Sequence, residues 1–201
     1  MIAPFFSKNP STVQSFFEKN GAIKFSAFQN NIFLFLGSHG ELFSNYPPYE
    51  IVPNNIKDVI IVDSDENRFL LWTRNKIGIL IFSFKKNSAD FFHQDTSIKW
   101  ITESGANIQQ AFEVAEGSYV LYLDNNTVFL TEVEAYGQRI QSTIVQVKNG
   151  TNIHYDDDKG TLYYIDPKTS LLMSVQIVAP DPIIPLSFYD QADSQQEQPA
   201  P

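Results

Sequence analysis

The chain has 201 residues, of which 43% are hydrophobic and 14% aromatic, a composition typical of one folded domain with a substantial core rather than of a disordered chain. Lysine and arginine total 14 against 23 aspartates and glutamates, and the formal net charge of -9 argues against nucleic acid as a partner because it repels phosphate backbones. Cysteine is absent, which excludes disulfides, thiolate nucleophiles and zinc sites that use sulfur.

The N-terminal segment, residues 1–21, carries the one helix signal that we identify. The run from Pro10 to Gln14 resembles a capping box, and Phe16 and Phe17 would supply an apolar side. The start of the chain lacks the charged and long apolar regions of an export signal, and no apolar run reaches the ~18 residues that a membrane span needs. We therefore expect a short helix that ends near Gly21, no signal peptide, and no membrane insertion by this chain.

Residues 22–178 contain short strands separated by turn formers. Aromatic and branched side chains predict strands first at residues 23–28, 32–36, 59–62, 69–73 and 78–84. Asn, Asp or Gly occupy the turns between apolar runs, at residues 38–40, 63–67, 124–126 and 156–160. This pattern predicts a succession of hairpins, that is, a meander of antiparallel strands.

A unit of three strands joined by turns recurs along this region. Its copies span residues 56–80, 108–132 and 152–175, and a weaker copy begins at Ile23. The later copies follow one another at about 45 to 50 residues, close to the period of propeller blades. Residues 97–101 and 141–147 are expected to form outer strands. Because a blade buries its faces only against neighbouring blades, the sequence predicts an all-β, propeller-like array of about four antiparallel blades, which need not close into a complete ring.

The first complete copy resembles the repeat of TolB-like, WD-like bacterial propellers, and is most similar to the repeat in PEGA-domain-containing surface proteins. The resemblance covers residues 23–177 and is carried by residues 56–58, 63–72 and 76–80, with Asp65 and Asn67 where the family has Pro and Gly. It implies a binding or scaffolding role without catalysis, commonly on a membrane-anchored, extracytoplasmic chain. It also implies that this sequence is part of a larger envelope-type protein.

Motifs for metal binding and catalysis are incomplete. The turn at residues 63–67 matches the first half of a calcium loop, but Arg68 and Arg74 occupy the positions that need glycine and glutamate. The adjacent carboxylates of residues 156–158 belong to a solvated turn, and His39, His93 and His154 lie far apart. Residues 37–40 do not form a nucleophile elbow. We therefore predict no metal, no cofactor and no catalytic residue.

Aromatic side chains are the remaining candidates for a binding surface, because amphipathic rings dominate binding sites. We expect Trp72 in the core of a blade and name Trp100, Tyr136 and Tyr189 as candidate binding residues. Tyr189 belongs to a Pro-rich tail, residues 179–201, in which residues 183–189 are apolar enough to dock and the part from Gln191 onward is expected to be disordered.

These observations predict a non-catalytic protein-interaction or scaffolding module whose partner is another protein or a second copy of the chain. Self-association is expected because an open array would leave apolar blade faces exposed. Two alternatives stay open. One is a module that binds glycans or cell-wall polymers, and the other is a propeller hydrolase with acidic residues in its channel.

Overall fold

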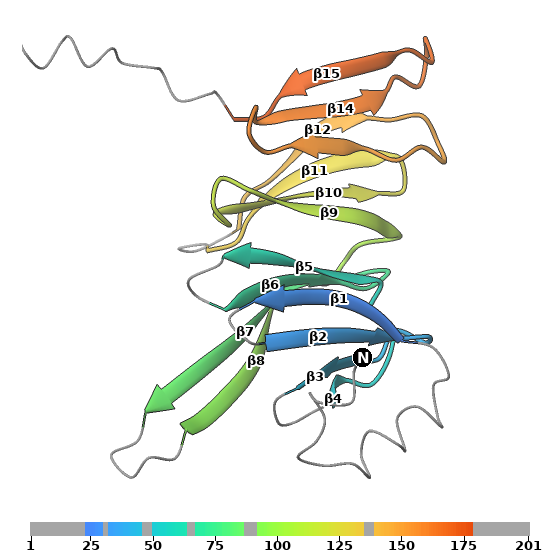
Figure 1. Cartoon of the computed structure of the whole chain (residues 1–201). Helices are drawn as coiled ribbons and strands as arrows, with labels where there is room; N and C mark the ends of the chain where they lie inside the picture. The colour runs from blue at the N-terminus through green and yellow to red at the C-terminus, as the bar shows by residue number, and fades with distance from the viewer. Residues whose placement is uncertain are drawn as a thin grey trace, which may run out of the picture.

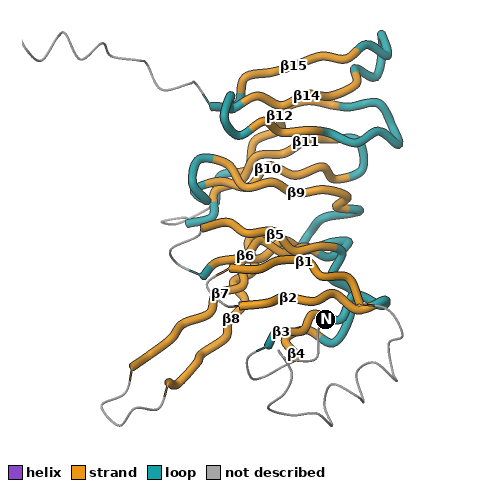
Figure 2. Tube along the Cα trace, in the orientation of Figure 1, coloured by secondary structure: helices purple, strands orange, loops and turns teal. Residues whose placement is uncertain are grey.

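The fold is that of a computed structural model, which describes residues 23–29, 32–45, 50–63, 67–86, 92–134 and 139–178. The helix expected near the N-terminus and the Pro-rich tail lie outside these residues. Within them the protein is all-β, with fifteen strands in four antiparallel sheets (Figures 1 and 2). The predicted fold class is therefore confirmed: the chain forms a propeller-like array of four blades.

Each blade is a meander in which strands follow chain order. Blade 1 contains β1 (Ile23–Gln29), β2 (Ile32–Gly37), β3 (Leu42–Ser44) and β4 (Glu50–Val52). Blade 2 contains β5 (Asp58–Asp63), β6 (Arg68–Trp72), β7 (Ile77–Lys86) and β8 (Phe92–Thr102). Blade 3 contains β9 (Ile108–Val114), β10 (Tyr119–Asp124), β11 (Thr127–Glu132) and β12 (Gln141–Gln146). Blade 4 has three strands, β13 (His154–Asp156), β14 (Thr161–Ile165) and β15 (Leu172–Gln176).

Three hydrophobic cores hold the blades together, one at each junction between successive sheets. Buried side chains of β2, β6 and β7 form the core between blades 1 and 2. The second core joins blades 2 and 3, and the third joins blades 3 and 4. Among the described residues no core joins blade 4 back to blade 1. The described array is therefore an open stack rather than a closed ring (Figure 1).

Strands in the middle of the stack are apolar on both faces, and β6 shows why. Phe69 and Leu71 belong to the core shared with blade 1, whereas Leu70 and Trp72 belong to the core shared with blade 3. Successive side chains of a strand point to opposite faces, so a strand between two cores needs a continuous apolar run. Trp72 is 6% exposed, which confirms its predicted place in a core.

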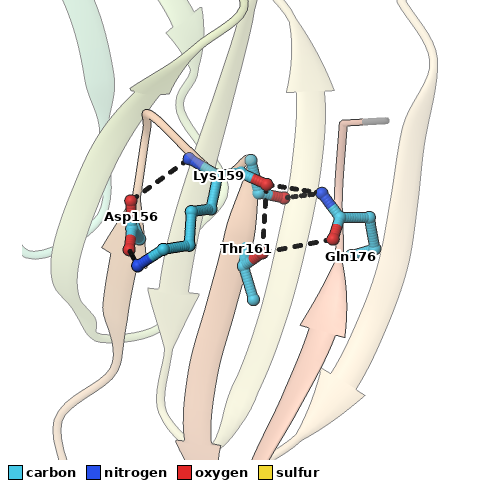
Figure 3. Close-up of polar contacts among 5 residues, drawn as sticks. Asp156, Lys159, Thr161 and Gln176 are labelled. Atoms are coloured by element: carbon cyan, nitrogen blue, oxygen red, sulfur yellow. Dashed lines mark hydrogen bonds and ion pairs between the residues drawn. The ribbon is translucent and has the colours of Figure 1, made fainter. Parts of the chain in front are cut away.

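Blade 4 has a different outward face, because it has a neighbour on one side only. Leu162 and Tyr164 of β14 contribute to the core with blade 3, so the residues between them point outward. The outward face carries an ion pair between Asp156 and Lys159, 2.7 Å apart, and a 3.2 Å hydrogen bond that the hydroxyl of Thr161 makes with the Gln176 side chain (Figure 3). This polar face closes the stack in the manner of a terminal capping repeat.

Two short strands, β3 and β4, were not predicted from the sequence. Strands β3 and β4 have three residues each, too few for an alternation pattern to stand out. Strand β8 begins at Phe92, well before the outer strand expected at residues 97–101, and pairs along the whole of β7. The four-stranded character of blade 1 therefore became apparent only from the structure.

Candidate functional site

A pocket of about 930 Å³ opens at one end of blades 1 and 2. Its walls are the β2–β3 turn, the β4–β5 connection, the β6–β7 turn and the loop after β8, together with Trp100 from β8 itself. All four connections lie where an even-numbered strand ends. Antiparallel meanders bring such loops to the same end of neighbouring blades, so the pocket belongs to both blades.

The β2–β3 turn is locked against the β4–β5 connection. The N–H groups of Asn55 and Ile56 donate to the carbonyls of His39 and Gly40, at 3.0 and 2.9 Å. Gly40 has a φ of +78°, and a Cβ there would lie 2.5 Å from the carbonyl oxygen of Ile56. Only glycine combines this backbone conformation with so close an approach. This wall of the pocket therefore depends on Gly40.

Glu41 stabilises the same turn through its side chain. Its side chain is buried, with 5% of the residue exposed, and its carboxylate accepts a 3.0 Å hydrogen bond from the N–H of His39. Burial alone would raise the pKa of Glu41, but hydrogen bonds from backbone N–H groups and the nearby His39 ring outweigh it and lower the pKa. Glu41 is therefore an ionised residue that holds the turn.

The β6–β7 turn forms the opposite wall. The hydroxyl of Thr73 accepts hydrogen bonds from the N–H groups of Asn75 and Lys76, at 3.2 and 3.0 Å. The carbonyl of Asn75 accepts a hydrogen bond from Gly105 in the loop after β8, and that of Arg74 accepts one from Ile108 at the start of β9. That loop is fastened in turn by Asp124, whose carboxylate accepts the N–H groups of Ala106 and Asn107. The wall is thus tied to both blade 2 and blade 3.

Trp100 lies on the rim because of its partner across the sheet. In the pairing of β7 with β8 it is opposite Gly78, and a Cβ on Gly78 would lie 2.8 Å from the indole ring. The ring therefore covers the space that a side chain would otherwise fill. Trp100 is half-buried and packs against the core between blades 1 and 2. The ammonium of Lys76 lies 5.3 Å from the centre of its ring, within range of a cation–π interaction.

The charges of the pocket have one sign. Lys57, Arg74 and Lys76 line it, and the described residues of its lining include no aspartate or glutamate. Lys57 is anchored by a 2.6 Å hydrogen bond from its ammonium to the carbonyl of Ile108. Burial, followed by the positive charge of Arg74, lowers the pKa of Lys57, and Asp124 opposes that change. The pocket is therefore a local cationic surface on a chain with a net charge of -9.

Three residues between β2 and β3, of which Ser38 and His39 line the pocket, resemble a hydrolytic triad in composition but not in arrangement. The hydroxyl of Ser38 and a carboxylate oxygen of Glu41 both contact the same ring nitrogen of His39, Nδ1, at 3.2 and 3.3 Å. In a working triad the nucleophile and the carboxylate use opposite ring nitrogens, so that the imidazole relays a proton between them. This constellation is therefore a turn-stabilising contact.

The structure places one of the three predicted binding residues. Trp100 lines the pocket, whereas Tyr136 and Tyr189 lie outside the described residues. The three cationic residues were not predicted from the sequence as a site: Arg74 and Lys76 lie in the β6–β7 turn and Lys57 in the β4–β5 connection. No local motif connects Lys57 with Arg74 and Lys76. Lys57 comes close to Arg74 and Lys76 because blades 1 and 2 pack together. In the sequence, only the repeat pattern indicated that packing.

The acidic turns differ in how far the structure describes them. Asp156 is paired with Lys159, and the calcium-like turn of blade 2 lies partly outside the described residues. Within the described part of the chain, no set of three or more His, Asp or Glu side chains is arranged to hold a metal ion. No helix in that part is long and apolar enough to cross a membrane.

No model of a known protein family matches the chain, and no curated protein matches it at a significant level. The function must therefore be argued from the pocket itself.

Proposed function

We propose that this chain is a non-catalytic protein-interaction module and that the pocket between blades 1 and 2 is its binding site. The observation that carries the proposal is the composition of the pocket, which combines an aromatic rim residue, Trp100, with three cationic side chains and exposed loop backbone. Aromatic and arginine side chains are enriched where proteins bind one another.

The pocket supports binding better than catalysis. Hydrolysis by a propeller channel needs carboxylates as acid and base, and the lining residues that the structure describes include none. His39, which lines the pocket, is held through Nδ1 by both Ser38 and Glu41, so the hydroxyl and the carboxylate share one ring nitrogen instead of using opposite ones. These features favour a role for the walls in holding a partner.

The glycan-binding alternative rests on Trp100, since sugar rings stack on exposed aromatic faces. Here the ammonium of Lys76 lies 5.3 Å from the centre of the Trp100 ring and the ring is half-buried. Less of its face is therefore open for stacking. The resemblance to TolB-like and PEGA-domain-containing propellers belongs to the proposal as well, because it agrees with a scaffold that presents loops to another protein in a larger envelope-type assembly.

Selection from a random peptide library displayed on phage, with the whole chain as target, tests the proposal. We expect recovered peptides to lose at least about tenfold in affinity for Trp100→Ala, because a central aromatic residue contributes on that scale. Ala106→Trp, which fills the pocket from its exposed rim, should have the same effect. Ile140→Ala removes a side chain that is 62% exposed outside the pocket and should leave affinity unchanged.

Two results would overturn the proposal. Peptides that bind the wild-type chain and both pocket variants equally well would place the binding surface elsewhere. A panel of oligosaccharides that binds in a pocket-dependent manner, while no peptide is recovered, would favour the glycan alternative. Circular dichroism of each variant confirms that it keeps the β fold.

A further inference from the structure

The cationic lining contrasts with the rest of the molecule. The whole chain carries 14 basic against 23 acidic residues, yet the described residues that line the pocket include three basic and no acidic ones. Random placement of charges on so acidic a chain would favour the opposite result. The walls that hold these residues are backbone-locked turns, so the arrangement is built into the fold rather than formed by long side chains on an open surface.

The positive charge of the pocket is incompletely compensated. Among the ion pairs of the described residues, Lys76 is neutralised by Glu103 at the rim, whereas no pair includes the guanidinium of Arg74, which is exposed. Lys57 contacts neutral oxygens, the carbonyl of Ile108 and the side chain of Asn107. Burial disfavours the charged form of Lys57 most and the carboxylate of Asp124 favours it, but the positive charge of Arg74 repels that of Lys57. An anion bound between them would relieve this repulsion.

We propose that the pocket selects an acidic segment of a partner polypeptide, with a carboxylate bound at Arg74 and Lys57. This inference rests on the proposed function, since it names the chemistry of the partner at the same site. The planar guanidinium of Arg74 matches the two oxygens of a carboxylate. Trp100, Val52 and Ile56 line the pocket beside the cations and suit the carbon chain of a glutamate or a neighbouring apolar residue.

The overall charge favours a short acidic peptide over longer polyanions. A net charge of -9 repels a nucleic acid or an anionic membrane over distances up to the Debye length, about 8 Å at physiological ionic strength. A peptide that inserts one or two carboxylates into the pocket meets the local positive field and little of the remaining surface. The pocket volume of about 930 Å³ accommodates a few residues of such a segment.

The test compares two probes, an acetylated and amidated hexaglutamate peptide and its hexaglutamine counterpart. Binding is followed by 15N NMR, in which the two tryptophans give two indole signals, one from the pocket and one from a core. We expect hexaglutamate to shift the Trp100 signal, leave the Trp72 signal in place, and bind more weakly as salt is raised from 20 to 150 mM. Hexaglutamine should cause no shift.

Variants separate local recognition from general charge. Arg74→Gln should weaken hexaglutamate binding about threefold to fivefold, as expected for an exposed charge pair, and Arg74→Glu at least about tenfold because it places like charges together. Lys168→Gln is the matched control: it removes the same charge from an exposed position outside the pocket and should leave affinity within about twofold.

The outcomes distinguish the two proposals. If the library peptides bind in the pocket but are not acidic, and hexaglutamate does not bind, the acidic-partner inference is wrong while the proposed function stands. If neither library peptides nor hexaglutamate depend on the pocket, both fail. Equal losses in Arg74→Gln and Lys168→Gln, or shifts produced only by inorganic phosphate or an oligonucleotide, would also overturn the inference.

Discussion

The two terminal blades differ in the side chains that they place on their outward faces, where neither has a neighbouring blade. On blade 4 the outward face is polar, with the Asp156–Lys159 pair and the Thr161–Gln176 contact. On blade 1, Leu34 and Leu36 belong to the core with blade 2, so Phe35 between them faces outward. Phe35 is nevertheless only 3% exposed, and Phe43, its partner across the sheet, is 7% exposed. The outward-facing side chains are therefore polar at the blade 4 end of the stack, and aromatic and buried at the blade 1 end.

This difference changes the expectation of self-association. An open array was expected to leave two apolar faces exposed, but the outward face of blade 4 is mostly polar. Its large exposed apolar side chains, Leu171, Leu172 and Met173, lie on and beside the edge strand β15. Self-association stays a prediction, which sedimentation equilibrium tests. The edge of β15 is the part of blade 4 where we expect a contact, because unpaired edges promote pairing.

The largest expected difference in the free energy of unfolding is between substitutions on the two outward faces. We expect Phe35→Ala to lower the free energy of unfolding by about 4 kcal/mol, since it empties a buried aromatic site. Tyr163→Ala, on the outward face of blade 4, should cost about 1 kcal/mol, because Tyr163 is half-buried beside His154. Urea denaturation of both variants measures the difference. Equal losses would mean that the two faces are not distinct.

A smaller difference in stability is expected between alanine substitutions at two glycines with left-handed backbone. Gly40 meets the backbone of Ile56, whereas Gly150, with a φ of +74°, has nothing within 4 Å of an added Cβ. We expect Gly40→Ala to cost about 3 kcal/mol from strain and collision together. Gly150→Ala should cost about 1 kcal/mol from strain alone.

Thermal melts and hexaglutamate titrations of both glycine variants give the comparison. Loss of the pocket with retention of the β signal is expected for Gly40→Ala only. An equal loss of stability in the two variants would show that the β2–β3 turn is not locked as described.

Acid should affect blade 1 more than blade 4. The folded state lowers the pKa of Glu41 below its usual 4.5, which burial opposes and backbone hydrogen bonds bring about. The stabilisation is therefore present above about pH 4.5 and is lost as the pH falls through the lowered pKa. Glu41→Gln should flatten the fall in unfolding free energy between pH 5 and 3 (about one unit either side of the usual carboxylate values).

Asp166 provides the comparison for this pH effect in blade 4. Its carboxylate accepts hydrogen bonds from Thr169 and Lys168, which lower its pKa. It lies in a turn of exposed residues, where solvent screens the interaction. We expect Asp166→Asn to change the pH profile less than Glu41→Gln. A larger change in Asp166→Asn would contradict this comparison.

The sequence predicted the blades better than it predicted the pocket, and the reason is physical. Strands such as β6 and β10 lie between two cores, so their continuous apolar runs are visible along the chain. Hairpin turns were found through their Asp, Asn and Gly residues. Strands β3 and β4 were too short to show a pattern. Of the pocket residues only Trp100 was named as a binding residue, because the position of Lys57 beside Arg74 depends on how two blades meet.

Two acidic turns, one in blade 2 and one in blade 4, should respond alike to the removal of metal. In blade 2, Arg68 and Arg74 occupy positions of the calcium-like turn where a calcium loop needs glycine and a bidentate glutamate. In blade 4, Lys159 already neutralises Asp156 through a 2.7 Å contact. A divalent cation would have to displace that ammonium in one turn and tolerate the arginines in the other. We therefore expect dialysis against chelator to leave the melting temperature unchanged. A drop of many degrees that calcium reverses would contradict this expectation, because a ligand that binds the native state and not the unfolded state raises the melting temperature. The same experiment on Asp156→Asn would then show which of the two turns held the ion.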